Sequence, residues 1–167
     1  MIVFETDRLI IRRLVTVDEA MLFHVYSDPD AMRYVDDGHP IERDACRRWI
    51  DVTLNNYEKY GYGMFAIDLR GTSKTIGFCG LVHPGGQAEP EIKYAFLRAY
   101  WAKGYATESG RALLDWGRDI GGLTQIIATV ASGNAASQRV LVKIGMSKVR
   151  TDQSDGAAID VYSISFC

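Results

Sequence analysis

The chain has 167 residues, enough for a sizeable core, and we expect residues 1–167 to form a single domain. Hydrophobic residues make up 47% of it and charged residues 24%, a balance typical of soluble globular proteins, and no apolar run reaches the ~20 residues that span a bilayer. The net charge of −2 argues against a broad basic surface for nucleic acid.

Cysteines and histidines are few and scattered, at Cys46, Cys79 and Cys167 and at His24, His39 and His83. Their spacing is typical of neither a disulfide framework nor a zinc site, so we expect free thiols and no bound metal. The N-terminal stretch lacks the basic and apolar regions of a secretory signal peptide. These features predict a cytoplasmic protein that contacts no membrane.

The N-terminal region predicts one strand followed by two helices. The stretch 8–14, RLIIRRL, has the composition of a strand. Thr16 and Glu19 have the spacing of a capping box and predict that a helix begins there. Pro29 prevents that helix from continuing, because proline lacks the amide proton that a helix interior requires. A short helical segment over 31–34 is expected to follow.

The middle of the chain changes from helical to strand periodicity. Apolar residues recur at helical spacing over 42–60, and Gly61 is expected to end this helix. The segments 63–69, 75–82 and 91–97 have the patterns of strands. Their short connections predict an antiparallel meander.

The C-terminal third predicts two helices, 105–120 and 134–145, and three strands, 124–131, 147–151 and 159–166. Asn134 is placed to cap the second of these helices, and Gly145 to end it. Strands and helices do not alternate strictly along the chain. The predicted fold class is therefore α+β, a single mixed sheet with helices packed on it.

The stretch RAYWAKGYATES places small residues and bare backbone where the helix at 105 begins. The first amides of a helix have no partner within it, and the helix dipole makes this end positive. The amides from Ala102 to Thr107 therefore predict a phosphate site, with Gly104 allowing close approach and Lys103 adding charge. The alternative is a glycine that only turns the chain from strand to helix.

Two longer stretches, EIKYAFLRAYWAKGYATES and NAASQRVLVKIGM, resemble the GCN5-related N-acetyltransferases (GNAT), and more narrowly the branch of ribosomal-protein N-terminal acetyltransferases. ETDRLIIRRL and TIGFCGL resemble the same branch, and the likeness runs from Phe4 to Phe166 in the family's order of elements. The resemblance implies a GNAT fold. Its mixed, mostly antiparallel sheet would be splayed at the centre beside a bulged strand over 91–97, with helices on both faces.

The resemblance also implies acetyl-coenzyme A (acetyl-CoA) as the cosubstrate. Its diphosphate would lie on the amides before the helix, and its pantetheine arm would pair with strand backbone. The implied binding residues are Phe96, Leu97, Ala102, Lys103, Gly104, Tyr105, Ala106, Thr107, Asn134, Ser137 and Lys143. The alternatives are a simple helix cap for Asn134 and a solvated Lys143.

The reaction implied by the resemblance is direct acetyl transfer to a primary amine in a ternary complex. Such a transfer needs a neutral amine, a stabilised oxyanion and assistance to the leaving thiolate. A backbone amide near Leu97 would stabilise the oxyanion. Glu91 would act as the base, directly or through water, unless it is an ordinary strand-edge carboxylate. His83 is a second candidate for the base, because an imidazole titrates near neutral pH.

Assistance to the leaving thiolate is a separate question, because the sequence departs from the family there. Many relatives carry, at the position of Leu141, a tyrosine that acts as the general acid. Ser137 is the expected catalytic replacement, since a hydroxyl can donate to a thiolate, and Tyr162 is the alternative. Without the tyrosine, a non-catalytic module that binds acyl-CoA is a second hypothesis. A nucleotide-binding protein with the same loop is a third.

The acceptor is expected to be a protein N-terminal α-amine, an amino acid or a small amine. Four carboxylates, Asp28, Asp30, Asp36 and Asp37, precede the helix at 42 and would favour a cationic amine. The alternative is a solvated acidic loop. Because members of the family are often monomers or dimers, we expect a monomer or a homodimer.

Overall fold

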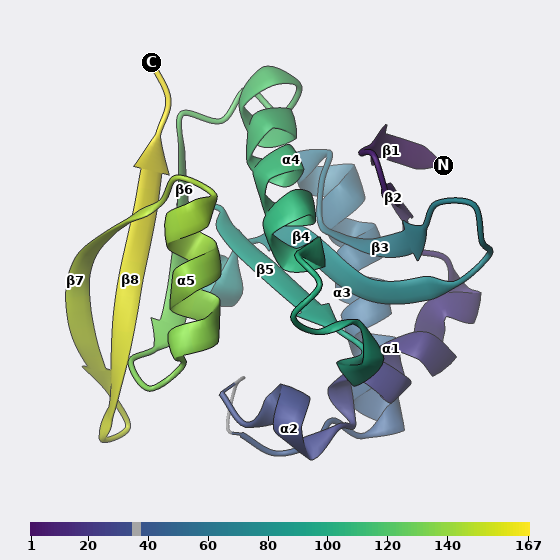
Figure 1. The fold of residues 1–167 in the computed structure, drawn as a ribbon, viewed down its shortest axis with the longest axis horizontal. Coiled ribbons are helices and arrows are strands. Elements are labelled where there is room, and N and C mark those ends of the chain that lie inside the picture. The colour runs from purple at the N-terminus through teal and green to yellow at the C-terminus, as the bar shows by residue number, and fades with distance from the viewer. Residues whose placement is uncertain (35–37) are drawn as a thin grey trace.

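A computed structural model describes residues 1–34 and 38–167 (Figure 1). Eight strands in this part of the chain form one sheet in the order β1-β2-β3-β4-β5-β6-β8-β7. They span Ile2–Glu5 (β1), Leu9–Arg13 (β2), Met64–Leu69 (β3), Thr75–Val82 (β4), Glu91–Phe96 (β5), Gln125–Ala131 (β6), Ser147–Ser154 (β7) and Ala157–Ser165 (β8). All neighbouring strands pair antiparallel except β5 and β6, which are parallel.

Helices cover both faces of this sheet, as expected. They span Glu19–Tyr26 (α1), Pro29–Met32 (α2), Arg43–Tyr60 (α3), Tyr105–Asp119 (α4) and Ala135–Lys143 (α5). On one face α4 and α5 bury Leu113 and Leu141, and on the other α1 and α3 bury Leu22 and Ile50 (Figure 1). None of the helices in the described ranges is long and apolar enough to cross a bilayer.

The sheet divides between β5 and β6. These strands are paired only at Glu91 and Ile127, where the Ile127 amide donates to the Pro90 carbonyl at 2.9 Å. β6 remains paired with β8 from Gln125 to Ala131. The expected splay is therefore confirmed, and Figure 1 shows the two strands diverging. β5 stays in register with β4 along its length, so the bulge expected in β5 is absent there.

The first helix begins differently from the expected capping box. A 3₁₀ turn, Thr16–Asp18, precedes α1. The Asp18 carboxylate accepts a hydrogen bond from the Val15 amide at 2.8 Å, one residue earlier in the chain than the predicted pair. The Glu19 carboxylate instead accepts from Arg47 at 3.1 Å.

Three short segments also differ from expectation. β1 was not predicted from the sequence, and it exists by pairing with β2. α2 begins at Pro29 because the Asp28 carboxylate caps it, accepting from the Asp30 amide at 3.0 Å. β7 and β8 extend into the expected turn at 152–157, which leaves Asp155 and Gly156 to connect them.

Candidate active site

The chain enters α4 through a loop that contains two left-handed residues. Ala102 has φ +57°, and Gly104, which is the N-cap, has φ +82°. In the described part of the chain, no protein group accepts a hydrogen bond from the amides of residues 102–107. The first helical bond runs from the Glu108 amide to the Gly104 carbonyl at 3.0 Å. Unpaired amides and the positive end of the helix dipole together favour an anion here.

The turn between β1 and β2 braces this entrance. Arg8 donates to the Glu108 carboxylate at 2.6 Å and to the Lys103 carbonyl at 3.0 Å. Its guanidinium also lies 4.4 Å from the centre of the Tyr105 ring. Thr6 donates to Glu108 at 2.6 Å. Burial raises the pKa of Glu108, but the hydrogen bonds from Thr6 and Arg8 outweigh it and hold the pKa below its ordinary value.

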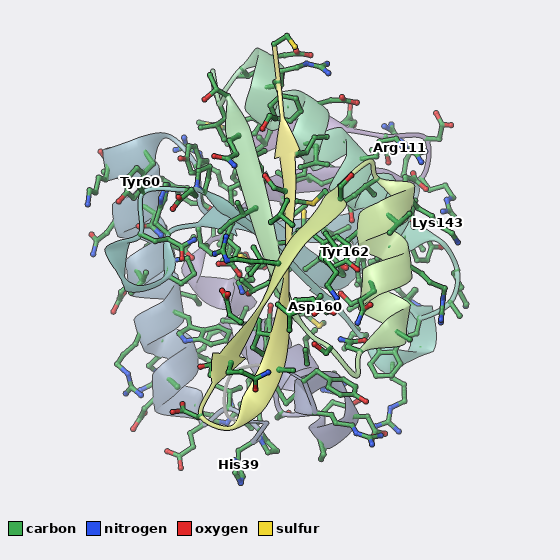
Figure 2. The ribbon with its side chains drawn as sticks, turned by 90° about the vertical axis from the view of Figure 1, so that its left-hand side faces the viewer. His39, Tyr60, Arg111, Lys143, Asp160 and Tyr162 are labelled. Carbon is green, nitrogen blue, oxygen red and sulfur yellow. The ribbon has the colours of Figure 1, made fainter. Side chains whose placement is uncertain are left out.

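An open hollow of about 540 Å³ lies beside the loop. It is lined by Thr6, Asp7, Gly104, Thr107, Glu108, Arg111 and Lys143. Arg111 of α4 and Lys143 of α5 lie next to each other, and Arg111 donates to the Lys143 carbonyl at 2.8 Å (Figure 2). Both side chains are exposed, as is Lys103 in the loop. Cations from several elements thus surround the unpaired amides, an arrangement that suits phosphate groups.

Two side-chain hydrogen bonds cross the splay, one on each face of the sheet. On the face covered by α4 and α5, the hydroxyl of Tyr94 lies 2.7 Å from the hydroxyl of Ser137 in the first turn of α5. On the opposite face, Thr129 of β6 donates to Glu91 of β5 at 2.5 Å. Asn134 caps α5 as expected, accepting from the Ser137 amide at 3.2 Å.

Glu91 is 2% exposed, and its carboxylate accepts three hydrogen bonds. Lys93 and Thr129 both donate to Oε1 at 2.5 Å, and Gln87 donates to Oε2 at 3.2 Å. A carboxylate has about four acceptor positions, so roughly one is left. Thr129 is exposed and therefore connects the buried carboxylate to the surface.

The backbone groups of β5 that face the splay belong to Tyr94 and Phe96. The Leu97 amide donates to the Ile76 carbonyl of β4 at 2.9 Å. Because bonding to one neighbour falls on alternate residues of an antiparallel strand, the groups of Tyr94 and Phe96 point away from β4. The Leu97 amide therefore faces β4, and the amide near Leu97 that faces the splay is that of Phe96. Trp101 Nε1 donates to the Phe96 carbonyl at 2.8 Å, which leaves the Phe96 amide facing the splay.

Comparison with known proteins identifies the family of the chain. A family model described as Acetyltransferase (GNAT) domain matches residues 8–147. The chain belongs to the GNAT acetyltransferase family. This GNAT protein is 35% identical over 160 residues to the uncharacterized protein YkkB of Bacillus subtilis (strain 168), which covers 94% of this chain and 92% of that one.

Solved structures share the fold of this GNAT protein. A GNAT-family acetyltransferase from Bacillus anthracis matches with a TM-score of 0.83 and 27% identity, covering 99% of this chain and 98% of that chain. RimL, a ribosomal L7/L12 α-N-protein acetyltransferase in complex with coenzyme A, matches with a TM-score of 0.82 and 15% identity, covering 99% and 98%. The GNAT fold is confirmed, and the protein is an acetyltransferase of the family that uses acetyl-CoA.

The acidic stretch expected near the acceptor is partly neutralised within the GNAT protein. Arg98 donates to the Asp28 carboxylate at 3.1 and 2.5 Å and pairs with Asp30 at 2.6 Å. The hydrogen bonds from Arg98 hold the pKa of Asp28 below its ordinary value. Asp36 and Asp37, the other two carboxylates, lie outside the described residues.

The second base candidate, His83, is engaged at both ring nitrogens. Nδ1 lies 2.9 Å from the Gln87 carbonyl, which can only accept, so Nδ1 donates. In the neutral ring Nε2 then accepts from the Tyr62 hydroxyl, 2.8 Å away. His83 therefore positions the loop before β5 and has no free lone pair for an acceptor amine.

Tyr162, the alternative to Ser137 for thiolate assistance, is hydrogen-bonded within the protein, and the position of the family tyrosine is apolar. The Tyr162 hydroxyl reaches from β8 toward α5 and donates to Gln138 at 3.4 Å (Figure 2). Leu141 is 2% exposed and belongs to the core. On α5, the hydroxyl that meets the splay is that of Ser137.

Several residues of the candidate site were missed by sequence reasoning, among them Thr6, Arg8, Tyr94, Arg111 and Thr129. The partners Thr6 and Arg8 lie 102 and 100 positions from Glu108 in the chain. Thr129 differs, because it is a polar side chain within the mostly apolar strand β6. That local contrast was the signal that could have found it.

Proposed function

We propose that this GNAT protein is an N-acetyltransferase that moves the acetyl group of acetyl-CoA directly to a primary amine while both substrates are bound. The observation that carries the proposal is the run of unpaired amides at 102–107. This run follows shortly after β5, whose edge toward β6 is open to the splay beyond Glu91. A phosphate site and an open strand edge suit a ligand that has a diphosphate at one end and amide groups along its arm.

The loop before α4 fits the diphosphate by its donors and by its charge. We assign to it the amides of Ala102, Lys103, Gly104, Tyr105, Ala106 and Thr107, with the side chains of Lys103 and Lys143 as cations. The amide of Phe96 and the backbone of Tyr94 take the place of Leu97 as partners of the pantetheine arm. Asn134 holds the first turn of α5, and so places Ser137, by its cap bond at 3.2 Å.

Glu91 is the proposed general base. Its carboxylate is held by Lys93, Thr129 and Gln87, with roughly one acceptor position left for a proton. Because the carboxylate is 2% exposed, we propose that the proton reaches it through a bridging water. A positioned base of this kind contributes roughly 10²–10⁴-fold to a proton transfer.

Ser137 and the Phe96 amide are the proposed donors at the reacting carbon. Acetyl-CoA supplies the acetyl group as a thioester. The Phe96 amide, fixed in β5 and facing the splay, would donate to the carbonyl oxygen as negative charge develops there. Ser137 would donate to the leaving sulfur from the opposite side of the splay. Both donors are set by the fold before the substrates arrive, which lowers the cost of reorganisation.

A protein N-terminal α-amine, an amino acid or a small amine is the proposed acceptor. The fold similarity to RimL, which is named as an α-N-protein acetyltransferase, supports the first of these. The pairing of Asp28 and Asp30 with Arg98 weakens the earlier argument for a strongly cationic amine.

The proposed function is tested by release of free thiol from acetyl-CoA in the presence of an amine panel. The panel contains a peptide with a free N-terminus, the same peptide with a blocked N-terminus, a free amino acid and a polyamine. We expect release that depends on an unblocked amine and saturates with acetyl-CoA. A protein that binds acetyl-CoA but turns over none of these amines is instead a non-catalytic binding module. That second hypothesis arises because Leu141 is an apolar core residue at the position of the family tyrosine.

A further inference from the structure

Tyr94 and Ser137 form a hydroxyl pair across the splay. Their oxygen atoms lie 2.7 Å apart, although one residue belongs to β5 and the other to α5. Both side chains are half-buried. The Ser137 main chain is fixed independently, because its amide donates to Asn134. The contact therefore joins a rigid strand to a capped helix start at the place where the sheet opens.

The direction of this hydrogen bond follows from the donors present. Each hydroxyl has one hydrogen to donate. If Ser137 donated to Tyr94, the phenol hydrogen would be left with the Ser137 carbonyl, 3.4 Å away, which is longer than the usual 2.5–3.0 Å of an O–H···O bond. If Tyr94 donates to Ser137 Oγ, the short contact is satisfied and the hydrogen of Ser137 is free to point elsewhere.

The phenol keeps its proton under ordinary conditions. Burial raises the pKa of Tyr94, and the hydrogen bond to Ser137 opposes this only in part. A protonated phenol is a permanent donor toward Ser137. A hydroxyl that accepts one hydrogen bond also becomes a better donor in the next, because neighbouring bonds polarise each other.

We propose that Tyr94 is a positioning residue for the leaving group: it donates to Ser137 Oγ and so directs the Ser137 hydrogen to the sulfur of CoA. The proposal rests on the proposed function. In the reaction the C–N bond forms, the C–S bond breaks with its electron pair on sulfur, and the amine proton goes to Glu91. Neither hydroxyl gives up its proton, and the sulfur anion is stabilised by the hydrogen bond from Ser137.

The first test needs no acceptor and no turnover. The thiol of bound CoA is titrated by its thiolate absorbance in the wild type and in Ser137→Ala, Tyr94→Phe and Tyr26→Phe. We expect the thiol to ionise about one pH unit higher in Ser137→Ala and to shift in the same direction in Tyr94→Phe, because a donor to the anion is lost or misdirected. Tyr26→Phe removes a buried phenol from the opposite face and should titrate like the wild type.

The second test is kinetic and uses the best amine from the panel. Tyr94→Phe and Ser137→Ala should each lower kcat about tenfold or more, with the KM for acetyl-CoA within about twofold of wild type. The double variant should be no slower than Ser137→Ala alone, because Tyr94 acts through Ser137. A phenol that only supported the fold would give losses that multiply and would leave the thiol titration unchanged.

Failure of this inference is distinguishable from failure of the proposed function. If the protein binds CoA and Tyr94→Phe matches the wild type in the thiol titration, Tyr94 has no positioning role. Multiplying losses in the double variant lead to the same conclusion. If the wild type does not bind CoA, both proposals fall. If it binds CoA without turnover, the proposed function fails and the leaving-group role of Tyr94 fails with it, and the thiol titration then reports only whether Tyr94 directs the Ser137 hydrogen to the sulfur.

Discussion

Gly104 has φ +82°, a conformation that costs a residue with a Cβ about 1–2 kcal/mol. A Cβ at this position would meet the tip of the Arg8 side chain at 3.3 Å and no core residue, so a larger residue would displace Arg8 but leave the core packing unchanged. The same position adjoins the amides that we assign to the diphosphate. Bulk at residue 104 should therefore act on the ligand more than on the core.

We predict that Gly104→Val raises the Kd for CoA by at least about tenfold while the protein still unfolds cooperatively. Gly61→Val is the matched control, because Gly61 has φ +81° with no atom within 4 Å of a Cβ and ends α3 instead of starting α4. Calorimetric titration with CoA gives the affinity, and thermal unfolding gives the stability. Equal Kd values for the two variants would contradict the assignment of the loop.

Glu91→Gln should lower kcat by about 100-fold or more, because an amide cannot accept the amine proton. Acetyl-CoA affinity should stay within about twofold, since Glu91 lies on the face of the sheet opposite Ser137. Glu89→Gln, at an exposed carboxylate two positions earlier, is the control and should match the wild type. Steady-state thiol release measures all three. Normal turnover in Glu91→Gln would leave Glu91 as a structural carboxylate of the splay.

For single residues of the site, sequence reasoning succeeded where local backbone chemistry decides the role of the residue. The small residues before Glu108 indicated the unpaired amides, and Asn134 was predicted to cap its helix. Which amide of β5 faces the splay was a different problem. That choice depends on the register with β4, and a slip of one position exchanges Phe96 for Leu97.

The position of helix α4 depends on contacts between its first turn and residues far away in the chain. Glu108, in its first turn, is bonded to Thr6 and Arg8 in the β1–β2 turn. Because its pKa is lowered in the folded protein, Glu108 contributes stability at pH values above the carboxyl pKa of the unfolded chain. This contribution is lost as the pH falls through the lowered pKa.

We therefore predict that Glu108→Gln is less stable than the wild type at about pH 7 and that the difference shrinks between about pH 5 and pH 3. Urea unfolding at several pH values measures it. Glu58→Gln, at an exposed position of α3, should show no such pH-dependent difference. If the difference between Glu108→Gln and wild type stayed constant with pH, the Thr6 and Arg8 bonds would not fix this carboxylate in solution.

Sequence reasoning located most elements by their periodicity and missed those that depend on long-range contacts. α3 and α4 have sustained amphipathic patterns and were placed within a residue of their observed ends. β1 has four residues and no such pattern. It is a strand because it pairs with β2, from Ile2–Arg12 to Glu5–Ile10. A short segment of this kind gains its structure from its neighbour.

The sheet consists of two halves, β1–β5 and β6–β8. The two halves are joined by one backbone pairing, at Glu91 and Ile127, and separate beyond it. The loop before α4 and the first turn of α5 flank the separation from one face. A ligand that bonds to both halves stabilises the folded state by mass action, by about 2.7 kcal/mol at 100 times its Kd. For a chain of this size that corresponds to a rise in Tm of roughly 5–10 °C.

We predict that saturating CoA raises Tm by this amount and protects the Phe96 and Tyr94 amides from hydrogen exchange. These amides face the splay and lack a strand partner, so the ligand would supply their acceptors. The Leu97 amide is already bonded to Ile76, and its exchange should change much less. Gly104→Val at the same CoA concentration should show a smaller rise in Tm and weaker protection, because its Kd for CoA is higher. Protection at Leu97 without protection at Phe96 would mean that β5 changes register when the ligand binds, because only a one-residue slip turns that amide away from β4.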